Sequence, residues 1–178
     1  MNLSTSNQMN NIYLKNIVRF VLLILLQVMV LNKMNLSGYI NPYAYILFIL
    51  LLPVNINKSV LLVLAFLTGL TIDIFGNTLG LHAAATVLLA FLRPGVINLF
   101  FNNIEFTGED EPGLPIIGVS GFFRYTLVLV FIHHAFLFFL EVFSLSNFVD
   151  TLYRIIFSTL VTTLVIMIIV LLFTRKNK

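Results

Sequence analysis

The chain has 178 residues, of which 60% are hydrophobic and only 10% are charged, and its mean hydropathy is +1.04. A water-soluble domain carries about 25% charged residues, so this composition excludes the ordinary soluble class and indicates an all-α integral membrane protein. The absence of cysteine excludes disulfides, thiolate nucleophiles and cysteine-bound metals. The net charge of +3 comes from dispersed basic residues, and nothing in their placement indicates nucleic-acid binding.

Six apolar segments follow one another, and we expect each to form a transmembrane helix of one compact bundle. A polar tail, residues 1–14, precedes them, and a basic tail, residues 175–178, follows them. Lys15 and Arg19 resemble the start of a signal peptide, but no small-residue cleavage site follows, so we expect an uncleaved helix. Within a single domain, residues 15–174, the predicted helices cover residues 17–31, 39–52, 58–75, 81–99, 122–145 and 149–173.

Prolines make two of these segments unusual. Asn41 and Pro42 can start the second segment, and Pro53 ends it after fewer than the roughly 20 apolar residues that a perpendicular crossing needs. Pro94 either ends the fourth helix or only kinks it, and a kink lets the helix continue. We therefore expect an irregular bundle in which some helices are short or broken.

The placement of lysine and arginine predicts the orientation of the chain. With six crossings and a cytoplasmic N-terminus, eight of the ten basic residues lie inside, and only Lys33 and Arg154 lie outside. Both termini are then cytoplasmic, and Arg93 and Arg124 extend to the inner membrane surface. The loop of residues 102–118, which holds four of the seven acidic residues, also lies inside, either as a solvated connector or as a contact for a cytoplasmic partner.

A turn between the third and fourth segments combines a carboxylate with an imidazole. Asp73 falls at the end of one helix and His82 at the start of the next, so each opposes the dipole of its own helix and suits that of the other. We predict an Asp73–His82 clasp across a glycine-rich reversal that forms a structural hairpin, with partner or ligand contact and catalysis as the alternatives. The predicted hairpin residues are Gly69, Asp73, Gly76, Asn77, Gly80, Leu81 and His82.

The fifth segment carries further ionisable groups at membrane depth. His133 and His134 are adjacent, and Glu141 follows His134 by seven residues, which places those two on one helix face. We expect buried hydrogen bonds between helices here, with metal binding, proton chemistry or partner contact as alternatives. A metal site drawn from His82, His134 and Asp73 does not match a known ligand spacing.

The sixth segment begins with a charged pair. Asp150 and Arg154 are four residues apart, which predicts a clamp within the first turns of the helix. Ser120 and Ser158 have no evident general base, and the sequence has no nucleophile elbow and no phosphate-binding loop. We therefore expect no enzymatic activity, no cofactor and no metal.

The stretch "LTGLTIDIFGNTLGLHAAATVLLAFLRP" resembles the MreD family of rod shape-determining proteins, which carry a glycine, aspartate and histidine segment of this kind after the third helix. The stretch Arg124–Glu141 is similar to the version of the family found in Bacteroidetes, and the resemblance covers nearly the whole chain. The matching positions are Gly69, Leu70, Asp73, Gly80, Leu81, His82 and Ala83.

The resemblance implies a six-helix protein of the bacterial inner membrane that works, without enzymatic activity, in the elongasome, the machinery for cylindrical cell-wall synthesis. It implies direct binding to the bitopic protein MreC, and links to MreB, RodA and a class B penicillin-binding protein, either directly or through MreC. The family is also similar in architecture to the S-components of vitamin (ECF) transporters. A small-molecule-binding permease subunit is therefore the alternative function.

An intramembrane enzyme is a third hypothesis. It would use Asp73, His82, His134 and Glu141 as its reactive groups. It requires those four side chains to converge within hydrogen-bond reach of one another.

Overall fold

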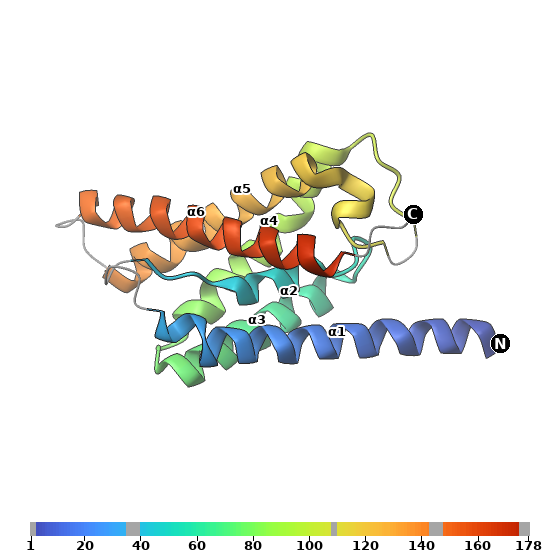
Figure 1. Cartoon of the computed structure of the whole chain (residues 1–178), viewed down its shortest axis with the longest axis horizontal. Coiled ribbons are helices and arrows are strands. Elements are labelled where there is room, and N and C mark those ends of the chain that lie inside the picture. The colour runs from blue at the N-terminus through green and yellow to red at the C-terminus, as the bar shows by residue number, and fades with distance from the viewer. Residues whose placement is uncertain (1–2, 35–39, 108–109, 143–147, 175–178) are drawn as a thin grey trace.

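The computed structural model describes residues 3–34, 40–107, 110–142 and 148–174, and the regular elements of this part of the chain are helices (Figure 1). Within these residues, five helical segments are long and apolar enough to cross a membrane, as a multi-pass membrane protein requires. The first is Tyr13–Lys33, which covers most of α1 (Leu3–Met29) and the turn after it. The other four are α3 (Lys58–Gly76), α4 (Leu81–Phe101), α5 (Leu114–Val142) and α6 (Phe148–Phe173).

Helices α1 and α3 run in the same direction along the bundle, whereas α3, α4, α5 and α6 alternate in direction (Figure 1). As a result, α1 begins and α6 ends at the same end of the molecule, which we call the termini end. The turn between α3 and α4 lies at the opposite end, which we call the corner end. The chain between α1 and α3 must therefore return from the corner end to the termini end.

This return segment, residues 40–57, is here called the second pass, and it corrects one predicted helix. The sequence predicted a transmembrane helix over residues 39–52. The structure has instead a 3₁₀ helix, η1 (Leu31–Lys33), after α1, a non-helical stretch over residues 41–43, a second 3₁₀ helix, η2 (Ala44–Ile46), and the four-residue helix α2 (Leu47–Leu50). Every side chain from Ala44 to Leu52 is buried, because the segment packs against α1, α3 and α6 and hydrogen-bonds to side chains of α4 and α5.

Other predicted boundaries also move. Helix α1 begins at Leu3, so its polar first residues extend the helix and do not form a separate tail. Helix α4 continues through Pro94 to Phe101, as a kinked helix allows. Helix α5 begins at Leu114, inside the predicted acidic loop, and Gly118 interrupts it with a positive φ of 68°.

The shortened loop between α4 and α5 is attached to the rest of the bundle. Glu111 forms ion pairs with Lys15 and Arg19 of α1, at 2.9 and 2.8 Å. The backbone N–H of Val54 also donates to the carbonyl of Asp110 at 2.9 Å. Two of the four acidic residues of this loop therefore hold the second pass and α1 at the termini end.

Candidate functional site

The corner between α3 and α4 is built around the carboxylate of Asp73, which is 2% exposed. Its two oxygens accept hydrogen bonds from the backbone N–H groups of His82 (3.1 Å) and Ala83 (2.8 Å), and Oδ1 also accepts from the Thr78 hydroxyl. The carboxylate thus satisfies amides that the first turn of α4 would otherwise leave free, and it lies at the positive end of that helix.

This geometry corrects the predicted Asp73–His82 clasp. The dipole argument placed Asp73 correctly at the start of α4, but its partners there are backbone amides, and the imidazole of His82 points to a different partner. The hairpin is real, and its closing element is a capping carboxylate from the neighbouring helix.

The reversal itself uses the conformations that its residues favour. Asn77 ends α3 in the left-handed region with φ of 51°, and Gly80 precedes α4 with φ of 83°. The N–H groups of Asn77 and Thr78 donate to the carbonyl of Asp73, and the N–H of Gly80 donates to that of Thr78. Leu81, also predicted here, is half-buried as the first residue of α4.

Gly69 explains how the two helices come close enough for this capping. A Cβ atom at this position would lie 2.5 Å from the Cα of Ala83 and from the carbonyl oxygen of His82. Only glycine leaves room for such a contact between two backbones. Gly76, in contrast, is exposed and a Cβ there would meet only the side chain of Thr78, so its size is not required in the same way.

The imidazole of His82 belongs to a buried cluster centred on the phenol of Tyr45. The Tyr45 hydroxyl lies 3.0 Å from Nδ1 of His82, 2.8 Å from Nε2 of His133 and 3.4 Å from the hydroxyl of Thr86. A phenol has one proton, so it can donate to one histidine while it accepts from the other. The second ring nitrogen of His133, Nδ1, is buried and has no hydrogen-bond partner among the described residues.

His134 takes part in a separate set of contacts with the second pass. Its Nδ1 is 2.8 Å from the carbonyl of Val130, and its Nε2 is 3.2 Å from the hydroxyl of Thr162 on α6. That hydroxyl also accepts the backbone N–H of Tyr43 at 3.0 Å. The expected hydrogen bonding between helices is therefore present, although a non-helical segment takes part in it.

Arg154 and Glu141 correct two further predictions: Arg154 does not form the expected clamp with Asp150, and Glu141 is exposed and not part of the expected buried hydrogen bonding. Arg154 pairs with Glu141 of α5 in a two-bond arrangement of 3.0 and 3.2 Å, and not with Asp150 of its own helix. Its guanidinium also lies over the ring of Phe138, 4.2 Å from the centroid. The pair joins α5 to α6, whereas Asp150 is exposed in the first turn of α6.

The four groups of the enzyme hypothesis thus use different partners. Asp73 binds backbone amides, His82 binds Tyr45, His134 binds Thr162, and Glu141 binds Arg154. Within the described residues, no group of three or more histidine or acidic side chains is placed to hold a metal ion.

The second pass is itself a polar site that the sequence did not predict. The backbone N–H groups of Asn41 and Tyr43 donate to Ser158 and Thr162 of α6. From α1, the buried amide of Gln27 donates to the carbonyl of Pro42 at 2.9 Å and accepts the N–H of Tyr45 at 3.4 Å. Side chains thereby replace the helical hydrogen bonds that this segment does not make.

Arg93 closes the other end of the second pass, where the sequence predicted an arginine at the membrane surface. Its side chain is completely buried. The guanidinium donates to the carbonyls of Leu52, Pro53 (3.3 Å) and Leu50 (3.5 Å), while Nε donates to the hydroxyl of Tyr125 at 2.9 Å. The positive charge of Arg93 is favourable here because it lies at the negative C-terminal end of α2.

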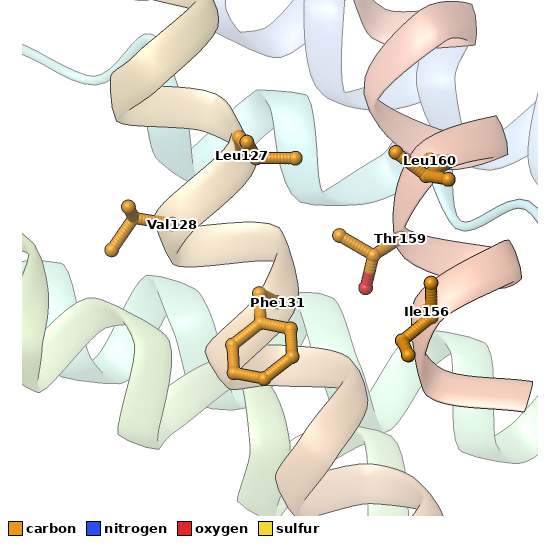
Figure 2. A pocket seen from close by; sticks show the side chains of 6 residues that line it. All are labelled: Leu127, Val128, Phe131, Ile156, Thr159 and Leu160. Atoms are coloured by element: carbon orange, nitrogen blue, oxygen red, sulfur yellow. The ribbon is translucent and has the colours of Figure 1, made fainter. Parts of the chain in front are cut away.

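A shallow apolar groove of about 380 Å³ runs between α5 and α6, away from these polar clusters. Figure 2 shows Thr159 between the two helices, and its buried hydroxyl has no hydrogen-bond partner in the part of the chain that the structure describes. Thr159 is the one polar side chain in the lining, which consists of Leu127, Val128, Phe131, Ile156, Thr159 and Leu160.

Sequence reasoning found Asp73, His82, His133 and His134 because ionisable residues are conspicuous in an apolar chain. It did not find Tyr45 at the centre of the cluster, since nothing in the spacing of an aromatic residue separates a buried hydroxyl from a membrane-surface one. Comparison with known proteins adds no further residues: no family model matches the chain, and neither curated proteins nor solved structures give a match.

Proposed function

We propose that this protein is a non-enzymatic scaffold of the bacterial elongasome, the function implied by the resemblance to the MreD family. The observation that carries the proposal is how the interior polar groups are used. Asp73, Arg93 and Thr162 all bind backbone atoms of another segment. Groups used in this way make the bundle rigid, which suits a body that holds other membrane proteins in place.

We place the direct partner, MreC, on the groove between α5 and α6. Transmembrane helices associate through close van der Waals packing. The groove offers an apolar surface for such packing, since Phe131 and Leu160 form part of its lining. Through MreC, the scaffold would be linked to MreB, RodA and a class B penicillin-binding protein.

The proposed setting is the inner membrane, with both termini in the cytoplasm. Among the described residues that are not buried, two basic residues, Lys33 and Arg154, lie toward the corner end, by their places at the end of η1 and the start of α6. Four lie toward the termini end, by their places in α1, α3 and α5: Lys15, Arg19, Lys58 and Arg124. Basic residues favour the cytoplasmic side, so their excess at the termini end supports this orientation.

Affinity purification of the tagged protein, followed by mass spectrometry, tests the proposal. We expect the wild-type chain to recover MreC. Leu160→Trp, which fills the groove, should lose most of that recovery, whereas Leu164→Trp, one turn further along α6 and exposed, should keep it. Failure of the wild-type chain to recover MreC would contradict the scaffold, and a co-purified small molecule would favour the permease alternative.

A further inference from the structure

The corner between α3 and α4 presents apolar side chains outward. Leu79 is 99% exposed, and Ile74 and Phe75 in the last turn of α3 are 71% and 61% exposed. The turn that carries Leu79 is held by the left-handed residues Asn77 and Gly80 on either side of it. The leucine is therefore displayed by a well-defined turn.

The hairpin carries no exposed charge that would suit an aqueous tip. Between Lys58 and Arg93 the ionisable residues are Asp73 and His82, and the side chains of both are buried. A loop in water ordinarily carries charged or strongly polar side chains, and contiguous exposed apolar patches mark a surface that something covers.

Backbone groups of the corner also form hydrogen bonds within the protein, as an environment with little water requires. The carbonyl of Asp73 accepts two N–H groups of the turn, its carboxylate accepts two N–H groups of α4, and Gly80 accepts the N–H of Ala84. In lipid, backbone polar groups must find partners within the protein, whereas at an aqueous surface water would serve.

The length of α3 places the corner at a definite depth. Its 19 residues span about 28 Å, slightly less than the roughly 30 Å of a hydrocarbon core. Helix α6 has 26 residues, or about 39 Å, and its start reaches further along the molecule than the corner does (Figure 1). A bilayer that covers α5 and α6 therefore also reaches the corner.

We propose that the α3–α4 corner lies at the boundary between the acyl chains and the headgroups of the bilayer, with Leu79 and Phe75 inserted among lipids. The occupant of this exposed patch is the lipid surface itself, and neither water nor another protein covers it. The short hairpin would draw the lipid boundary inward on this side of the bundle, while α5 and α6 would hold it further out.

Site-directed spin labelling tests this inference, because a chain without cysteine allows single labels. Leu79→Cys and Phe75→Cys would carry a nitroxide in the full chain in phospholipid vesicles, with Asp150→Cys as the control in the first turn of α6 and Leu164→Cys as the control midway along that helix. The readout is the collision rate with oxygen, which concentrates in lipid, against that with a water-soluble nickel complex.

We expect the oxygen-to-nickel ratio at residues 79 and 75 to lie near that of residue 164 and well above that of residue 150. A ratio at both corner positions equal to that of residue 150 would place the corner in water. Low accessibility to both reagents would mean that a second copy of the chain covers it. Either of these two results overturns the proposal.

Discussion

The α3–α4 hairpin and the second pass satisfy their backbone hydrogen-bonding groups in opposite ways. In the hairpin, two regular helices make their own hydrogen bonds, and one carboxylate, Asp73, caps the reversal. In the second pass, the backbone forms hydrogen bonds with side chains of four other helices, namely Gln27, Arg93, Tyr125 and Thr162. Non-helical backbone at membrane depth is tolerated only where the protein itself supplies such partners.

This difference predicts where each region is vulnerable. The second pass should be sensitive to the loss of a single polar side chain that binds its backbone, because few other groups can replace such a donor in a buried site. The hairpin should instead be sensitive to size at the point where its two backbones meet. The four variants below test that contrast, from the largest expected effect to the smallest.

Replacing Arg93 should have the largest effect. Arg93→Leu removes the donor to Leu52 and Pro53, and each buried carbonyl left without a partner costs about 1–3 kcal/mol. We expect the free energy of unfolding in detergent to fall by at least about 3 kcal/mol. Arg124→Leu, the same substitution at an exposed position, should change it by less than about 0.5 kcal/mol. Equal effects of the two variants would contradict the proposed role of Arg93.

Adding one methyl group to the helix contact should come second. Gly69→Ala places a Cβ 2.5 Å from backbone atoms of α4, so the helices must separate, and overpacking of this kind costs about 1–3 kcal/mol. Gly95→Ala is the matched control, since a Cβ there meets nothing within 4 Å and should stabilise α4 by up to about 1 kcal/mol. Thermal unfolding of the two proteins should therefore shift in opposite directions.

Neutralising the capping carboxylate should cost less. Asp73→Asn keeps one acceptor oxygen but loses the other and the charge at the start of α4, which should lower the free energy of unfolding by about 1–2 kcal/mol. Amide exchange at His82 and Ala83 should accelerate. Asp150→Asn, in an exposed first turn, should leave exchange at those two amides unchanged. Unaltered exchange in Asp73→Asn would remove the capping role.

Removing the phenol that joins two histidines should have the smallest effect. Tyr45→Phe leaves ring nitrogens of His82 and His133 without a partner, at a cost of about 1 kcal/mol. Nitrogen NMR of the imidazoles should show both rings changed, because the phenol determines which nitrogen of each carries the proton. Tyr153→Phe, on the exposed face of α6, should leave both spectra as they are. Unchanged imidazole spectra in Tyr45→Phe would contradict the hydrogen bonds described for this cluster.

The sequence was sufficient for three of the long helices. Long apolar segments predicted α3, α4 and α6 to within a few residues, because a helix in lipid needs only length and apolar side chains. It failed for residues 39–52, which are as apolar as a helix but are shaped by partners elsewhere in the chain. No local sequence pattern predicts that Gln27, Ser158 and Thr162 form hydrogen bonds with the backbone of this segment.

The candidate site divides in the same way. Asp73 and Gly69 were found from a glycine-rich reversal with a misplaced charge, since that pattern is local. Arg93 was misplaced because an arginine near a helix end ordinarily extends to the membrane surface, and only the short α2 helix makes a buried cation useful. Arg154 was assigned to Asp150 because spacing within one helix is visible in sequence, whereas the approach of Glu141 from another helix is not.

The most direct test concerns whether the second pass crosses the membrane without a spanning helix. Lys33 and Lys58 are exposed residues that flank it, and the chain has no native cysteine. Lys33→Cys and Lys58→Cys would be reacted with a membrane-impermeant maleimide in intact and in permeabilised cells. The described fold predicts that the two positions react from opposite sides of the membrane. Reaction of both from the same side would contradict it, because the chain between the two positions would then begin and end on one side of the membrane.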